Sequence, residues 1–247
     1  MFVLSHADPG LNRILSCADG PASFNAESTR RGTAVVSMDP LYRLGTTTIR
    51  ARIAATYDQI LEQVRRNRQQ FVWDTIQSVE ELGRIRMQAM QEFLDDYDEG
   101  KRQGRYVAAE LPTIPFPDKS FDLAVCSHFL FLYTERLSEA FHHSAIQELC
   151  RVTREVRVFP LLGLDGKTSP YVASIVKSAN DSWEVSLETV PYEFQRGENQ
   201  MMRLMAGAFR FCTDWEKRNG SQLVNSLGNN CSQKSDVRPE NQRFGPL

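Results

Sequence analysis

Apolar residues recur along the chain at two kinds of spacing, one typical of buried strands and the other of amphipathic helices. Short continuous apolar runs lie at 14–15, 34–36, 121–126 and 156–162, which is the pattern of parallel strands buried on both faces. Residues 24–29 can form a short helix between the first two runs. Strands that alternate with helices in this way predict an α/β fold with a doubly wound, mostly parallel sheet.

Two long segments after the second run have apolar residues three and four positions apart, and they predict helices over about 46–68 and 76–97. Together they make up an insertion of residues 46–100 between the second and third strands. The first helix carries mainly basic side chains and the second mainly acidic ones. Solvated faces, or pairing of the two helices with each other, explain these charges; a site for a charged partner is the alternative.

The remaining predicted elements are shorter: a strand at 105–109, helices at 134–152 and 171–177, a strand at 183–190 and a last strand within 192–205. Prolines and turn-forming residues at 112–120 predict a loop. From residue 217 the chain is rich in Asn, Ser, Gln and Gly and has few apolar residues, so it cannot bury enough surface to order itself. We therefore expect one domain over 1–215 and a disordered tail over 216–247.

The composition of the chain limits the binding partners and the cellular compartment that we expect for it. The formal net charge is -2 and the sequence pI is near 6.1, so we expect neither nucleic acid nor a membrane surface as a partner. No apolar run approaches the roughly 20 residues that cross a bilayer, and the N-terminus lacks a basic leader, which predicts a cytoplasmic protein. The five cysteines are widely spaced and form neither a zinc pattern nor a disulfide framework. The oligomeric state stays open.

Residues 13–39 predict a strand, a tight turn, a helix and a second strand, which is the order of a mononucleotide-binding unit. The turn contains Ala18, Gly20 and Ala22, whose small size lets the backbone approach a ligand closely. Asp39 follows the second strand and is placed to accept hydrogen bonds from a ribose diol. An ordinary strand-to-helix turn is the alternative interpretation.

Ser127 and His128 directly follow the apolar strand at 121–126. Ligands in open α/β sheets bind beyond the carboxyl ends of the strands, so these two residues and Asp39 point to one crevice. His128 is a candidate general base for an oxygen or nitrogen nucleophile. A role in shaping the cofactor pocket is the alternative for this side chain.

Three stretches carry a family resemblance. The first is an apolar strand and a turn with Gly20-Pro21, and the second is the acidic strand end at Asp39. The third is a run into the buried strand, made up of Leu111-Pro112, Pro115-Phe116-Pro117-Asp118 and Ser120-Phe121-Asp122. Over about residues 10–205 the chain thereby resembles the Rossmann-like, class I S-adenosylmethionine-dependent methyltransferases. It departs from them in four places: Ser16 stands where an acidic residue is usual, Ala18 and Ala22 replace glycines, and no Pro-Gly-Gly turn precedes Val156.

The resemblance implies a seven-stranded sheet with an antiparallel last strand, and S-adenosyl-L-methionine as the cofactor. It implies cofactor contacts from the turn and the strand ends, at Ser16, Cys17, Ala18, Gly20, Pro21, Asp39, Pro40, Leu111 and Ser127. Phe24 and Tyr133 are candidates to face the sulfonium cation, with core packing as the alternative. His142 and His143 lie mid-helix without a third ligand at metal spacing, so we expect no metal site there.

The predicted function is methyl transfer from S-adenosylmethionine to a small molecule by in-line displacement, which depends mainly on alignment of the reacting atoms. The departures at Ser16, Ala18 and Ala22 motivate an alternative, a methyltransferase-like binding module without turnover. A nucleotide-binding reductase is a third possibility from a different class. Because few residues precede the first strand, the helices at 46–100 are the candidates for a lid over the substrate.

Overall fold

The computed structural model describes residues 2, 4, 12–179 and 183–206. The described residues belong to one compact unit of the chain, which ends at Ala206. The predicted tail at 216–247 lies outside the described residues.

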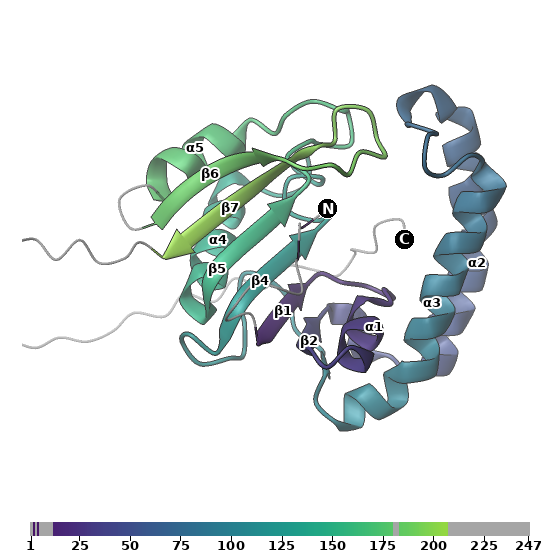
Figure 1. The fold of residues 1–247 in the computed structure, drawn as a ribbon, viewed down its shortest axis with the longest axis horizontal. Helices are drawn as coiled ribbons and strands as arrows, with labels where there is room; N and C mark the ends of the chain where they lie inside the picture. The colour runs from purple at the N-terminus through teal and green to yellow at the C-terminus, as the bar shows by residue number, and fades with distance from the viewer. Residues whose placement is uncertain (1, 3, 5–11, 180–182, 207–247) are drawn as a thin grey trace, which may run out of the picture. The chain divides into compact units, whose positions relative to one another are not determined.

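A seven-stranded sheet forms the centre of the unit, with the order β3-β2-β1-β4-β5-β7-β6 (Figure 1). The strands are β1 Arg13–Cys17, β2 Ala34–Met38, β3 Tyr106–Val107, β4 Phe121–Ser127, β5 Thr153–Phe159, β6 Trp183–Thr189 and β7 Gln200–Ala206. The first five strands are parallel, and β7 runs antiparallel to both β5 and β6. The prediction of a doubly wound, mostly parallel seven-stranded sheet is confirmed.

Helices cover both faces of this sheet because successive strand residues point to opposite sides. Leu15 of β1 belongs to the main core, to which α4 Glu139–Val152 and α5 Tyr171–Ala179 also contribute. Ile14, its neighbour, belongs to a smaller cluster on the other face, against which Phe24 of α1 Phe24–Arg30 packs. Strands buried on both sides in this way need the continuous apolar runs seen in the sequence.

The helix predicted over 134–152 is shorter than expected. It begins at Glu139, because the Ser138 side chain accepts a hydrogen bond from the amide of Phe141 and thereby caps the first turn. Residues 134–137 form turns instead. The short helix and the two strands at the N-terminal end of the domain lie where the pattern placed them, within a residue or two at each boundary.

The insertion between β2 and β3 is a helical hairpin (Figure 1). Its elements are the 3-10 turn η1 Pro40–Arg43, α2 Thr46–Arg66, the 3-10 turn η2 Arg68–Gln70 and α3 Val79–Arg102. The second helix begins at Val79 rather than near residue 76, because the Ser78 side chain accepts from the Glu81 amide while the Glu81 carboxylate accepts from the amide of Gln77. This differs from a capping box in that the Glu81 carboxylate accepts from the amide before the cap instead of from the amide of Ser78 itself.

Four aromatic side chains pack together between the base of the hairpin and the sheet: Tyr42, Phe93, Tyr97 and Tyr106. Each is 3% exposed or less, and their ring centroids lie 5.0–6.0 Å apart. The hydroxyl of Tyr97 donates to the carbonyl oxygens of Tyr42 and Leu44. The base of the insertion is therefore part of the folded core.

The tip of the hairpin docks on the loop at 190–199, which connects β6 to β7. The Val72 amide donates to the carbonyl of Phe194 at 2.7 Å, and the Arg196 amide donates to the carbonyl of Gln70 at 2.8 Å. The rings of Phe71 and Phe194 stack with centroids 5.0 Å apart. The hairpin is thus held at both ends, by the sheet at its base and by this loop at its tip.

Candidate functional site

The carboxyl ends of β2, β1 and β4 lie side by side at one edge of the sheet. Cys17 at the end of β1 is in register with Met38 of β2 and Cys126 of β4. The residues that follow them therefore meet at this edge: Ala18, Asp39 and Ser127. The chain continues from β1 to β2 on one side and returns to β4 on the other, so the edge lies at the switch point where open α/β sheets bind ligands.

The turn between β1 and α1 uses left-handed backbone at two positions. The φ angles of Ala18 and Gly20 are 55° and 57°. The Ala18 amide donates to the carbonyl of Met38 at 2.8 Å, which ties the turn to the end of β2. A Cβ built on Gly20 would meet no atom within 4 Å, so the space above this residue is open to a ligand. Alanine is strained in the conformation of Ala18, by roughly 1–2 kcal/mol relative to glycine.

Asp39 connects this turn to the segment after β2. Its Oδ2 atom accepts from the Gly20 amide at 3.0 Å, and its Oδ1 atom accepts from the Leu41 amide at 2.7 Å. The hydroxyl of Tyr42 donates to the Gly20 carbonyl at 2.7 Å from the same side. Burial raises the pKa of Asp39, and the two amide hydrogen bonds oppose that shift. Each carboxylate oxygen keeps a second acceptor position, so the half-buried carboxylate can still accept from a diol.

A second carboxylate, on Asp19, lies in the turn and was not singled out from the sequence. It accepts from the Ser37 hydroxyl at 2.6 Å and also bonds with the side chain of Ser16. Burial raises the pKa of Asp19 to about 6; the two hydroxyls oppose this and the negative charge of Asp39 adds to it. The Ser37 hydroxyl in turn accepts from Asn25 of α1 at 3.1 Å. Two carboxylates therefore adjoin this edge, Asp19 within the turn and Asp39 after β2.

Several of the predicted cofactor residues have side chains in the protein interior. These are Ser16, Cys17, Pro21 and Leu111. Burial also raises the pKa of both the Cys17 and Cys126 thiols, in keeping with the expectation that they are packing residues. Of the predicted set, Ala18, Gly20, Asp39, Pro40 and Ser127 are the half-buried members that border the edge.

The structure brings Ser127, His128 and Glu198 together, an arrangement that no order in the sequence indicated. The Ser127 hydroxyl lies 2.7 Å from His128 Nδ1, and Glu198 Oε1 lies 3.2 Å from His128 Nε2. The His128 backbone is left-handed, with a φ of 51°, and its amide donates to the carbonyl of Phe159 at 2.7 Å. Because 38% of the imidazole side chain is exposed, it can meet a ligand at the strand edge.

Glu198 reaches His128 from the loop at 190–199. It is 3% exposed, and its Oε2 atom accepts from the amide of Gln195 at 3.2 Å. Arg86 of α3 and Tyr192 of the same loop lie within electrostatic reach of it. Burial lowers the pKa of Arg86, and the charges of Tyr192 and Glu198 oppose that shift. Glu198 lies seventy positions after His128 and in no motif, so only the folded chain reveals it.

The other candidates from the sequence have structural surroundings. Phe24 packs on a core cluster, and the guanidinium of Arg136 lies 5.8 Å from the ring centroid of Tyr133. The ring nitrogens of buried His142 contact the carbonyl oxygens of Ser138 and Leu130. His143 contacts the hydroxyl of Ser174. Among the described residues, no three His, Cys, Asp or Glu side chains are grouped closely enough to bind a metal ion.

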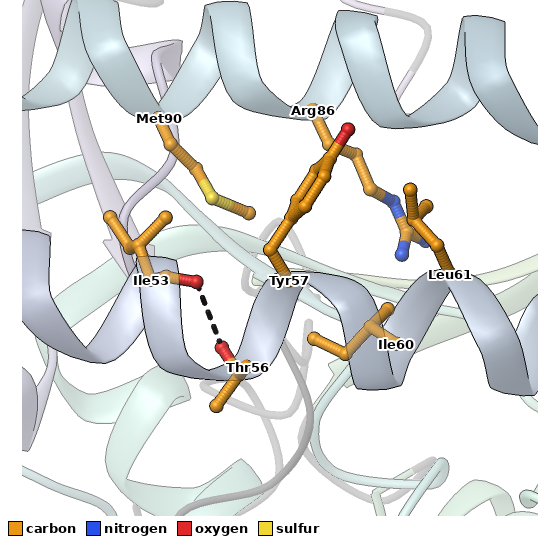
Figure 2. A pocket seen from close by; sticks show the side chains of 7 residues that line it. All are labelled: Ile53, Thr56, Tyr57, Ile60, Leu61, Arg86 and Met90. Carbon is orange, nitrogen blue, oxygen red and sulfur yellow. Dashed lines mark hydrogen bonds between the residues drawn. The ribbon is translucent and has the colours of Figure 1, made fainter.

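A small cavity lies between the two helices of the insertion (Figure 2). Its volume is ≈ 10 Å³, about the space of one water molecule. It is lined by Ile53, Thr56, Tyr57, Ile60, Leu61, Arg86 and Met90. The hairpin is therefore nearly close-packed along this seam.

None of the described helices is long and apolar enough to span a membrane.

The residues at the edge fit a nucleoside cofactor. The open space above Gly20 allows close approach to the backbone, and Asp39 offers two oxygens to a ribose at the end of β2. Ala18 and Ser127 border the same space on neighbouring strands. These residues would hold S-adenosylmethionine, whose sulfonium supplies an activated methyl group when it is bound.

The sheet has its antiparallel strand β7 between β5 and β6, and its candidate ligand edge lies at β1 and β4. This order defines a Rossmann-like fold of the methyltransferase type. Residues 85–156 match a family described as a methyltransferase domain. In its fold and in this domain match the chain resembles the class I, Rossmann-like methyltransferases. One curated relative is the uncharacterized protein MJ0045 of Methanocaldococcus jannaschii, which is 31% identical over 192 residues, 77% of this chain and 84% of the relative.

The solved structures to which the chain is similar share little sequence with it. The PH0226 protein of Pyrococcus horikoshii is 10% identical with a TM-score of 0.42, covering 78% of this chain and 81% of its own. A S-adenosylmethionine-dependent methyltransferase of Aquifex aeolicus is 13% identical with a TM-score of 0.38, covering 80% and 84%. At these scores the assignment rests on the sheet order and the domain match instead.

Proposed function

We propose that the protein binds S-adenosylmethionine at the edge formed by β1, β2 and β4 and transfers its methyl group to a small molecule. The observation that carries this proposal is the link between the turn and Asp39, in which one carboxylate holds the Gly20 amide and still has acceptor positions for a ribose. The site residues named from the sequence remain part of the proposal.

Methyl transfer needs an acceptor atom in line with the bond from carbon to sulfur. The acceptor forms a bond to the methyl carbon while the sulfur leaves as a neutral thioether, and the acceptor loses a proton. The protein's main contribution is to hold both molecules in this alignment. The strand ends supply that rigidity, because the elements around them are buried on both faces of the sheet.

His128 is the group that we propose takes the acceptor proton. Glu198 can only accept a hydrogen bond, so Nε2 of His128 carries the hydrogen between them and Nδ1 has a free lone pair. The Ser127 hydroxyl donates to that lone pair at 2.7 Å. A hydroxyl or amine acceptor bonded to Ser127 would pass its proton through this hydroxyl to Nδ1.

A small molecule is the acceptor that the charges favour. The chain has a net charge of -2, and the basic side chains near the hairpin tip pair with acids, as Arg65 does with Glu80 and Arg66 with Glu62. Nucleic acid binding draws instead on unpaired basic residues that release counterions. We propose on the same grounds that the protein works in the cytoplasm, away from membrane surfaces.

The test of turnover is formation of S-adenosylhomocysteine. Purified protein is incubated with S-adenosylmethionine and fractions of a metabolite extract, and the product is measured by mass spectrometry. The proposal expects product only with some fractions, and a loss of it in His128→Asn. No product with any fraction, despite measurable cofactor binding, would contradict the proposed turnover.

The binding module without turnover is a second candidate, and one observation favours it. Ala18 has a left-handed backbone that suits glycine better, so the turn is less well adapted to a cofactor than a glycine-rich one. Ala18→Gly distinguishes the two. It should strengthen cofactor binding in either case, but it should raise product formation only if the protein is an enzyme.

A further inference from the structure

The loop at 190–199 contacts two parts of the molecule at once. On one side it receives the hairpin tip, through the bonds from Val72 to Phe194 and from Arg196 to Gln70. On the other side it carries Glu198, which reaches His128 at 3.2 Å. Only one residue separates Arg196 from Glu198 along the chain. A shift of the docked tip would therefore move the carboxylate relative to the imidazole.

We propose that Glu198 is a positioning residue that fixes the Nε2–H tautomer of His128, and that docking of the hairpin tip on the 190–199 loop holds Glu198 against the ring. This inference rests on the proposed function, in which His128 accepts a proton. It assigns a role to an acidic residue and to the insertion beyond that of a lid.

The chemistry of the three side chains supports the tautomer. A carboxylate has no hydrogen to donate, so its partner nitrogen must carry one. The Ser127 hydroxyl can donate or accept at Nδ1 and so adapts to either tautomer. Glu198 is therefore the group that decides which nitrogen is protonated. When the tautomer of a catalytic histidine is wrong, as in a serine protease without its aspartate, the rate falls by about 10⁴.

The surroundings hold Glu198 in place from several elements. Its second oxygen accepts from the Gln195 amide, and its side chain is 3% exposed. The titratable groups that face it are Arg86 from α3, Tyr192 from the loop and His128 from the end of β4. The insertion thus contributes both the docked tip and a positive charge.

Docking of the tip is the part of this arrangement that a single substitution can weaken. The Phe71 and Phe194 rings stack with Trp73 edge-on to Phe194, and Phe71 pairs with Gln195 as an antiparallel bridge. Phe71 is half-buried, whereas Ile85 of α3 is 39% exposed. Phe71→Ala therefore removes the ring stack of the docking contact and weakens it, and Ile85→Ala is a matched control on the same hairpin.

The experiment is a long-range proton–nitrogen NMR spectrum of the histidine rings in the full ¹⁵N-labelled chain, at a pH of about 8 where an ordinary imidazole is neutral. The His128 signals are assigned by their loss in His128→Asn. We expect the wild-type ring to show the Nε2–H pattern, and Glu198→Gln and Glu198→Ala to give mixed tautomers. Glu184→Gln, at an exposed position of β6, should leave the pattern unchanged. An unchanged pattern in both Glu198 variants would overturn the role of Glu198.

Phe71→Ala should shift His128 toward the mixed pattern, while Ile85→Ala should not. If Phe71→Ala keeps the wild-type pattern, the role of the tip is overturned. The amide spectrum of each variant checks that it is folded. Once an acceptor is found, Glu198→Gln should lower kcat at least about tenfold and leave the dissociation constant of S-adenosylmethionine unchanged. An unchanged kcat would contradict the positioning role, whereas absence of turnover in the wild type would contradict the proposed function and leave the NMR result standing.

Discussion

Asp39 Oδ2 accepts a hydrogen bond from the Gly20 amide at 3.0 Å, so the acid at the end of β2 is bound to the turn at the end of β1. The sequence suggests that Asp39 serves a ligand. The structure adds that it also orders the turn that would contact the ligand. Cofactor affinity and local stability should therefore change together when this residue is replaced.

Asp39→Ala should weaken binding of S-adenosylmethionine at least tenfold, because hydrogen bonds to a charged group contribute roughly 1.5–3 kcal/mol each. It should also lower the melting temperature of the free protein, since the Gly20 and Leu41 amides lose their acceptor. Calorimetry and thermal denaturation measure the two effects. Asp58→Ala, on the exposed side of α2, is the control and should change neither. Wild-type affinity in Asp39→Ala would place the cofactor elsewhere.

The raised pKa of Asp19 predicts a pH dependence of stability. The folded value is about 6 and the usual value is 3.8, so the folded protein binds the proton more tightly than the unfolded chain. The free energy of unfolding contributed by this group therefore falls as pH rises from about 4 to 6 and stays low above that. Asp19→Asn should remove this trend and raise stability at pH 7 by on the order of 1–2 kcal/mol. Denaturant unfolding across pH 4–7 tests it, and parallel curves for the two proteins would count against it.

Gly83 permits the close approach of α2 and α3. A Cβ at this position would lie 2.5 Å from the Tyr57 hydroxyl oxygen and 2.8 Å from a methyl carbon of Leu61. Gly83→Ala should destabilise the protein by about 1–3 kcal/mol, even though alanine favours helix. Gly83→Ala combined with Tyr57→Phe should recover part of this loss. Stability equal to that of the wild type would mean that the hairpin seam is looser than its geometry indicates.

Ligand binding should slow amide hydrogen exchange more in the middle of the hairpin than at its two ends. Its base is fixed by the aromatic cluster around Tyr42 and its tip by the stack of Phe71 on Phe194. Amide exchange should therefore slow most between these fixed points when S-adenosylhomocysteine binds, and more there than in β4. Phe93→Ala should unfold much of the base, at a cost of about 3–5 kcal/mol, because the ring is fully buried. Exchange that ignores the ligand would make the hairpin a purely structural insertion.

The sequence was sufficient for the sheet. Continuous apolar runs and three-to-four spacing are strong signals, because burial on two faces or on one helix face dictates them. The start of α4 was wrong by several residues, since a local cap at Ser138 outweighs the apolar pattern before it.

The polar contacts of the site were beyond sequence reasoning. Glu198 reaches His128 through a loop that the hairpin tip positions, and no spacing in the sequence encodes that meeting. Asp19 lies between the small residues Ala18 and Gly20 of the turn, and its bond to Ser37 depends on the register of β1 and β2. Contacts between distant segments arise from tertiary packing, which periodicity does not report.

Titration calorimetry of the full chain with S-adenosylmethionine tests the central claim most directly, with NADH as the comparison ligand and Asp39→Ala as the matched variant. We expect one binding site for S-adenosylmethionine, affinity at least tenfold weaker in Asp39→Ala, and no heat from NADH. A hundredfold excess of ligand over its dissociation constant should also raise the free energy of unfolding by about 2.7 kcal/mol. No binding of S-adenosylmethionine at millimolar concentration, or binding of NADH in its place, would contradict the account.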